Sequence, residues 1–109
     1  MPLYELLDYL TESGAVPFRS WLTSLADRQA QARIIARLQR MAAGNFGDSK
    51  PIAEGVWELR IDHGPGYRVY YARAGKELLL LLVGGDKRKQ QADIETAISY
   101  WQDWNRRNR

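Results

Sequence analysis

The chain has 109 residues, of which 45% are hydrophobic and 27% charged, a balance that indicates one globular domain over residues 1–109 and excludes disorder. It has no cysteine, which excludes a disulfide framework or a zinc thiolate site, and its longest apolar run, residues 78–83, is far below the ~20 residues that cross a bilayer. The lack of cysteine favours a reducing, cytoplasmic setting, and the short apolar runs predict no contact with a membrane. The net charge of +3 is consistent with a polyanion or an acidic protein as partner.

The first half of the chain predicts a strand followed by two helices. Residues 2–10 can form an opening strand, and residues 11–17 form a turn in which Pro17 suits the first turn of a helix. Asp27 is the expected N-cap of a second helix, whose apolar stripe continues to Gly44, a candidate C-cap. Residues 44–51 are rich in turn formers and predict a loop.

Residues 55–83 predict three consecutive strands. Apolar and polar residues alternate on either side of a Gly/Pro turn, which places Trp57, Leu59 and Ile61 on one face of the first strand. A hairpin folded about Gly64 sets Arg60 opposite Arg68 and Glu58 opposite Tyr70 on the other face. The third strand covers residues 77–83, and a final helix begins at Gln90.

The element order is therefore β-α-α-β-β-β-α. Strands that follow helices, instead of alternating with them, indicate an α+β fold with a mainly antiparallel sheet of about four strands. We expect two helices to cover one face of this sheet and the other face to stay partly open for a ligand. Because the run 78–83 is apolar on both faces, part of it should be exposed and available to a protein partner.

The Arg60–Arg68 pair is the main chemical signal. Two like charges directly opposite one another on a sheet are destabilising, and an anion lying across them would relieve the repulsion. The sequence G-G-D-K-R-K after the third strand can add Lys87 and Arg88 at the rim, which would make a phosphate-sized cationic site. The alternative is a solvated face on which Glu58 neutralises Arg60.

Other polar residues carry weaker signals. His63 is the single histidine and lies in the turn, and no second histidine or cysteine accompanies it, so we expect no metal. Arg33, Arg37 and Arg40 form a basic stripe on the second helix, interpreted as a solvated face or as a contact line for RNA.

The whole chain resembles the RelE/ParE superfamily of type II toxins, and within it the HigB-related addiction module killer proteins. The resemblance rests on the segments 17–25, 30–48, 55–71 and 79–97, that is PFRSWLTSL, AQARIIARLQRMAAGNFGD, GVWELRIDHGPGYRVYY and LLLLVGGDKRKQQADIETA. It implies a small cytosolic toxin inhibited by the antitoxin encoded beside it, a helix-turn-helix protein similar to HigA.

The resemblance also implies roles for residues. Arg68 falls on the superfamily's catalytic arginine, Lys87 on the second catalytic cation and Arg60 on a basic residue of the preceding strand. Val56 and Glu58 replace lysines of RelE-like nucleases, and Asp93 replaces a catalytic tyrosine. Further cations expected to contact RNA are Arg37, Arg73, Arg88 and Lys89.

Many members of the superfamily cleave mRNA on the ribosome, and the implied reaction is attack of a ribose 2′-OH on the adjacent phosphate. Arg68 and Arg60 would stabilise the phosphorane, Glu58 or His63 would be the base, and Lys87 the acid or a further clamp. We therefore expect a metal-independent mRNA interferase without a cofactor, with mRNA, the ribosome and the antitoxin as partners. The alternatives are a non-enzymatic gyrase inhibitor of the ParE type and a degenerate toxin that only binds its antitoxin.

Overall fold

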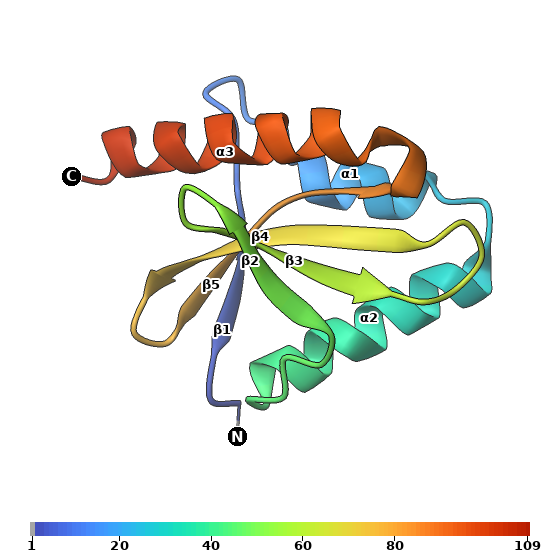
Figure 1. Ribbon diagram of the computed structural model, residues 1–109. Helices are drawn as coiled ribbons and strands as arrows, with labels where there is room; N and C mark the ends of the chain where they lie inside the picture. Colours follow the sequence, from blue (N-terminus) through green and yellow to red (C-terminus); the bar gives the residue numbers. More distant parts are fainter. Residues whose placement is uncertain (1) are drawn as a thin grey trace.

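The computed structural model describes residues 2–109, which form an α+β fold in which helices lie on both sides of a five-stranded mixed sheet (Figure 1). The strands are β1 (Glu5–Asp8), β2 (Ser49–Ala53), β3 (Val56–Ile61), β4 (Tyr67–Gly75) and β5 (Leu78–Asp86), in the spatial order β1-β5-β4-β3-β2. The helical elements are α1 (Pro17–Ser24), α2 (Arg28–Ala42), the 3-10 helix η1 (Lys87–Lys89) and α3 (Gln90–Arg107). The α+β class is confirmed, whereas the expected number of four strands was one too few.

The two helices after β1 begin as the sequence predicts. Pro17 occupies the first turn of α1, where a missing N–H costs nothing. The Asp27 carboxylate caps α2 by accepting hydrogen bonds from the backbone N–H groups of Gln29 and Ala30, at 2.9 and 3.1 Å. Gly44 follows the helix end with a φ of +97°, the left-handed conformation that stops a helix.

The sequence pattern does not predict strand β2, whose first half falls in the expected loop 44–51. It pairs antiparallel with β3 through a tight turn in which both Glu54 and Gly55 have positive φ, 55° and 89°. Such a turn matches the twist of a hairpin. Pro51 made the segment look unlike a strand, but β2 is an edge strand, the position in a sheet where proline is tolerated.

The opening strand is shorter than residues 2–10, and it occupies the opposite edge of the sheet. Glu5–Asp8 run parallel to Leu78–Leu81 of β5, which makes the sheet mixed, although its three other pairings are antiparallel. The parallel neighbour follows from the long connection between β1 and β5, which contains both helices and β2 to β4.

The β3–β4 hairpin has the predicted register. Arg60 pairs with Arg68, Glu58 with Tyr70, and Leu59 with Val69. Because side chains alternate across a strand, Glu58, Arg60, Arg68 and Tyr70 share one face of the sheet, and this part of the prediction is confirmed.

One apolar cluster lies between the sheet and the helices α1 and α2. Its buried members include Phe18, Leu22, Ile34, Leu38, Met41, Leu59, Val69, Tyr71, Leu79 and Leu81. Trp21 of α1 lies directly over Gly84 of β5, so close that a Cβ at Gly84 would overlap the indole ring. Glycine at this position therefore sets how closely α1 approaches the sheet.

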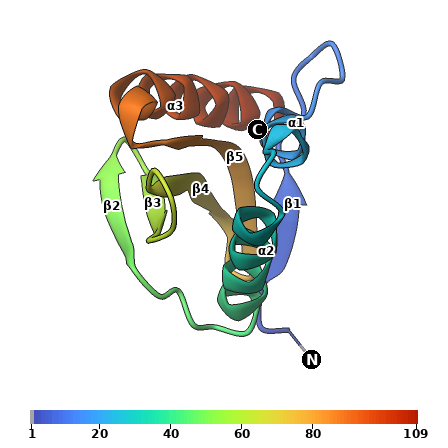
Figure 2. The same cartoon turned by 90° about the vertical axis from the view of Figure 1, so that its right-hand side faces the viewer.

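The other face of the sheet is covered by α3, contrary to the expectation of an open face. Figures 1 and 2 show α3 along one side of the strands and α2 on the other. Val56, Tyr70, Leu80 and Leu82 are buried beneath α3, where they pack with Ala97, Trp101 and Trp104 of that helix. The apolar run 78–83 is thus covered by the chain itself, and so it does not indicate a partner.

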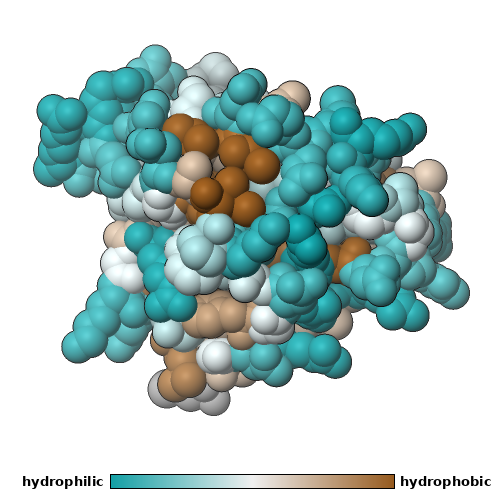
Figure 3. Space-filling model, viewed as in Figure 1, coloured by the Kyte–Doolittle hydropathy of each residue, from teal (hydrophilic) through white to brown (hydrophobic). Residues whose placement is uncertain are grey.

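The remaining exposed large apolar side chains lie around β1 and on α2. They are Leu3, Leu7, Leu10 and Ile35. Hydrophilic residues predominate on the face drawn in Figure 3, with the largest apolar area just below α3. None of the helices in residues 2–109 is long and apolar enough to cross a membrane.

We predict that Gly84→Ala destabilises the protein by about 1–3 kcal/mol, because the added methyl group must displace the Trp21 ring or the backbone of β5. Gly75→Ala is the matched control, since a Cβ there would meet only the Leu78 Cβ at an ordinary distance of 3.6 Å. Urea unfolding of both variants measures the difference. Equal stability of the two would show that the α1–β5 contact adjusts freely.

Candidate functional site

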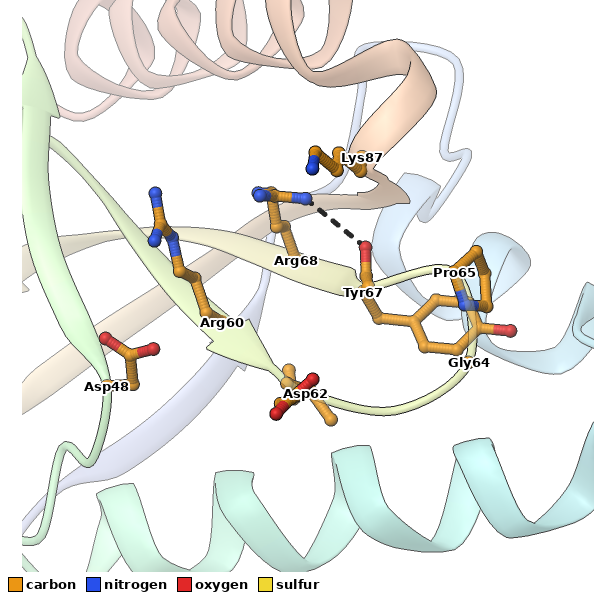
Figure 4. Close-up of a pocket in the computed structure, with 10 residues that line it drawn as sticks. Asp48, Arg60, Asp62, Gly64, Pro65, Tyr67, Arg68 and Lys87 are labelled. Carbon is orange, nitrogen blue, oxygen red and sulfur yellow. Dashed lines mark hydrogen bonds between the residues drawn. The ribbon is translucent and has the colours of Figure 1, made fainter.

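A pocket of about 400 Å³ lies at the end of the β3–β4 hairpin (Figure 4). It is lined by Asp48, Arg60, Ile61, Asp62, Gly64, Pro65, Gly66, Tyr67, Arg68 and Lys87. Because helices cover both faces of the sheet, this pocket opens at the sheet's end, where β3 finishes, β4 begins and η1 starts. Three of the predicted site residues, Arg60, Arg68 and Lys87, are brought together here.

The backbone around Gly66 holds two of these cations in place. The Lys87 N–H donates a hydrogen bond of 3.0 Å to the Gly66 carbonyl, which ties the end of β5 to the hairpin turn. Arg68 Nη1 donates to the same carbonyl at 3.3 Å. Gly66 has a φ of +85°, a conformation that glycine adopts at no steric cost, so the turn and both cations depend on this residue.

Glu58 lies behind the two arginines and is completely buried, with 0% of its surface exposed. Its Oε1 accepts a hydrogen bond from Arg60 Nε at 3.1 Å, and its Oε2 lies 3.5 Å from Arg68 Nε. Oε2 also accepts hydrogen bonds from the Tyr70 hydroxyl at 3.0 Å and from the Gln90 side-chain amide at 2.9 Å. One carboxylate therefore connects β3, β4 and α3.

This environment keeps Glu58 ionised. Burial raises the pKa of a carboxyl, but the hydrogen bonds from Gln90, Arg60 and Tyr70 and the charge of Arg68 outweigh it and lower the pKa of Glu58. Burial and the adjacent carboxylate raise the pKa of Tyr70, so its phenol stays protonated and donates. A carboxylate with both oxygens engaged and no access to solvent is a counter-ion for the two arginines.

Two expectations about this face need correction. The repulsion between Arg60 and Arg68 is relieved by Glu58, so the pair does not by itself require an external anion. The partly open face predicted from the sequence would also leave Glu58 and Arg68 accessible, yet they are only 0% and 8% exposed because α3 packs over them. Substitutions at these two positions will therefore affect folding as well as any activity.

Two buried polar atoms near the pocket have no hydrogen-bond partner among the described residues. One is Arg68 Nε, which is close enough to Glu58 for an ion pair but does not make a hydrogen bond. The other is Oδ2 of Asp93, on the first turn of α3. The Asp93 carboxyl packs on Gly85, the residue that pairs with Arg68 across the β4–β5 ladder. Burial raises the pKa of Asp93.

The single histidine is outside the pocket lining. His63 Nε2 lies 3.0 Å from Oδ2 of Asp27, the cap of α2, so the ring joins the hairpin turn to the start of that helix. The hydrogen bonds from the Ala30 backbone and from His63 lower the pKa of Asp27. This contact gives His63 a structural role that its position in a turn did not indicate.

The further cations expected to bind RNA also lie outside the pocket lining. Arg73, at the far end of β4, packs over the rings of Tyr4, Phe46 and Trp57. Arg88 is paired with Asp86 at 2.9 Å. The last two are Lys89, which is exposed before α3, and Arg37, which is partly buried on α2 with its guanidinium over Gly47.

Sequence reasoning did not identify Asp48 and Asp62, the two carboxylates that line the pocket. Asp62 directly follows β3, a position that the strand pattern could have indicated, whereas Asp48 reaches the pocket only because β2 pairs with β3. No group of three or more His, Cys, Asp or Glu residues within 2–109 is arranged to hold a metal ion.

Two comparisons with known proteins place the chain among relatives. The family model described as phage derived protein Gp49-like (DUF891) matches residues 20–99, which include the pocket. An uncharacterized protein of Haemophilus influenzae strain Rd is 50% identical over 80 residues, covering 73% of this chain and 81% of the relative.

We predict that Glu58→Gln lowers the free energy of unfolding by about 2–3 kcal/mol at neutral pH, since it leaves two facing arginines without a counter-charge. This is below the usual cost of breaking a buried ion pair because the Arg60 side chain is 41% exposed and can turn to water. The native pKa of Glu58 lies below its ordinary value of 4.5, so the carboxylate's stabilising effect is complete above that pH and is lost as the pH falls through the native pKa.

Chemical denaturation of wild type and Glu58→Gln at several pH values tests this, with Glu95→Gln, on the exposed side of α3, as the matched control. The difference between wild type and Glu58→Gln should shrink in acid. A difference independent of pH would contradict the role of the charge.

Asp93→Asn should have the opposite effect. The folded protein holds the Asp93 pKa above its ordinary value of 3.8, so the native state loses stability as the pH rises from that value through the native pKa. The neutral, isosteric amide avoids this loss, and the variant should melt at a higher temperature than wild type at pH 7. Thermal melts at neutral and acid pH measure the gain, which should vanish in acid; a lower melting temperature at pH 7 would contradict it.

Proposed function

Because the chain belongs to the Gp49-like family of phage-derived proteins, which is associated with toxin–antitoxin modules, we propose that it is the toxin of such a module and a RelE-like, HigB-related mRNA endonuclease. The observation that carries the proposal is the convergence of Arg60, Arg68 and Lys87 on one open pocket at the sheet's end. These are the positions that the family resemblance assigns to the cationic residues of the superfamily.

The pocket suits a phosphate that gains negative charge during reaction. Attack of a ribose 2′-OH on the adjacent phosphate forms a crowded phosphorane, and hydrogen-bond donors that are already in position stabilise it. The Arg68 guanidinium is held by the Gly66 carbonyl and by Glu58, and Arg60 is held by Glu58, so both donors are oriented before substrate binds. DNA lacks the 2′-OH, so this reaction is confined to RNA.

Proton transfer requires groups that reach the substrate. Lys87 lines the pocket and is exposed, so it can protonate the leaving 5′-oxygen or neutralise its charge. Glu58 and His63, the two candidate bases from the sequence, are engaged with the arginines and with Asp27. Asp48 and Asp62 line the pocket, and we assign to one of them the removal of the 2′-OH proton.

The partners follow from the same proposal. The pocket has no histidine in its lining and so lacks the usual acid–base group for rapid cleavage of free RNA, and a ribosome that holds mRNA in register would compensate by aligning the reacting atoms. The antitoxin, a helix-turn-helix protein in this proposal, would add acidic groups to the cationic pocket. The exposed apolar side chains Leu3, Leu7 and Leu10 near β1 offer it further contact area.

Substitution in the pocket tests the activity. We expect Arg68→Ala to abolish growth arrest on induction and Arg68→Lys to impair it severely, because an ammonium cannot replace a bidentate guanidinium. Removal of one positioned donor typically costs ~100- to 1000-fold in rate. Since Arg68 is buried, the thermal midpoint of each variant must be measured alongside.

The second substitution to test is Lys87→Ala, and Arg88→Ala is its matched control. Both side chains are exposed and differ by one position, but only Lys87 lines the pocket. Lys87→Ala should weaken growth arrest and Arg88→Ala should not. Mapping transcript ends after induction identifies mRNA cleavage, whereas DNA breaks with an SOS response would indicate gyrase as target. Growth arrest by a folded Arg68→Ala protein at the wild-type rate would reject the proposal.

A further inference from the structure

The side of α2 next to the end of β3 carries a cationic strip that the proposed reaction does not use. Arg33, Arg37 and Arg40 recur along one side of this helix, and α2 contains no acidic residue at all. Like charges three or four residues apart on a helix are mutually destabilising. None of the three lies within 4.0 Å of a carboxylate of the described residues, so the strip is left without internal compensation.

The strip lines a second hollow, of about 200 Å³, that adjoins the candidate site. Its lining consists of Arg33, Ala36, Arg37, Arg40, Ile61 and Asp62. Ile61 and Asp62 also line the cationic pocket, so the two hollows meet at the end of β3. Figure 4 shows α2 running beside the pocket on the side of Asp62. A chain that leaves the pocket in this direction passes directly onto the strip.

Arg37 reaches toward the pocket wall. Its guanidinium lies over Gly47, so near that a Cβ there would overlap it, and Gly47 precedes Asp48 of the pocket lining. The strip therefore extends from α2 to the loop that borders the proposed reaction centre.

We infer that Arg33, Arg37 and Arg40 bind the phosphate backbone of the RNA strand next to the phosphate held in the pocket. Guanidinium groups match phosphate oxygens in geometry and keep their charge at any physiological pH. Ala36 lies between Arg33 and Arg37 in the lining of the hollow, and its small side chain leaves room for a backbone to approach. A docked amphipathic helix would instead need an apolar groove for its anchors, whereas four of the six residues that line this hollow are charged and only Ala36 and Ile61 are apolar.

This inference rests on the proposed function but is tested separately, by binding and not by cleavage. The probe is a fluorescent, 2′-O-methylated single-stranded RNA of about 12 nucleotides, which cannot be cut, titrated at KCl concentrations from roughly 25 to 150 mM. The variant Arg33→Gln/Arg37→Gln/Arg40→Gln removes the strip. Lys76→Gln/Arg106→Gln/Arg109→Gln removes three exposed charges far from it and is the matched control.

Each neutralised phosphate of a single strand contributes about 0.7 to the slope of log K against log salt. The strip variant should therefore lose about 2 from this slope, so that its loss of affinity relative to wild type is roughly 40-fold greater at about 25 mM than at about 150 mM KCl, while the control variant stays close to wild type. Equal losses in both variants, or none in the strip variant, would overturn the inference. So would a strip variant that binds RNA normally but no longer co-purifies with the neighbouring-gene partner, because the strip would then be a protein-docking surface.

The two proposals fail in different ways. A strip variant that has lost RNA binding, together with transcripts that stay intact after induction, would support the strip and reject the nuclease. Normal RNA binding by the strip variant, with clear transcript cleavage by wild type, would support the nuclease and reject the strip as an RNA-binding surface.

Discussion

The buried carboxylate of Glu58 is the interaction on which the rest of the site depends. It is placed between two arginines that face each other across the β3–β4 ladder, and it also accepts hydrogen bonds from Tyr70 of β4 and Gln90 of α3. A buried ion is tolerated only when it is paired and hydrogen-bonded. The same contacts that make Glu58 tolerable fix the two guanidinium groups side by side and join α3 to the sheet.

Coverage of both sheet faces decides where a ligand can bind. With α1 and α2 on one face and α3 on the other, large open surfaces of the sheet are lost, and the accessible cations are those at its end. The hairpin turn at Gly66 matters for this reason, because one carbonyl receives both the Lys87 N–H and Arg68 Nη1. The pocket therefore forms at the end of the sheet, where β3 ends and β4 begins.

Some arginines of the molecule are paired with a carboxylate or packed on aromatic rings, and others are not. Arg88, Arg106 and Arg107 are paired with nearby aspartates, and Arg73 packs on aromatic rings. The α2 arginines have no such partners within the described chain, and they adjoin the pocket. A modest net charge of +3 therefore conceals a local cationic path, since the sum over the chain includes many charges that are already neutralised.

The sequence by itself determined the elements with strong local signals: the capped helix after Asp27, the hairpin about Gly64 with Arg60 opposite Arg68, and the final helix. Alternation and caps are local properties, so they can be read without the fold. Strand β2 could not be predicted from the sequence because Pro51 is acceptable only in an edge strand. Whether a strand lies at the edge of the sheet is decided by tertiary pairing. The tertiary structure also decided the position of α3, and with it the burial of Glu58 and Arg68. The apolar stripe of a helix shows that the helix packs on something, but it does not show which face of the sheet the helix covers.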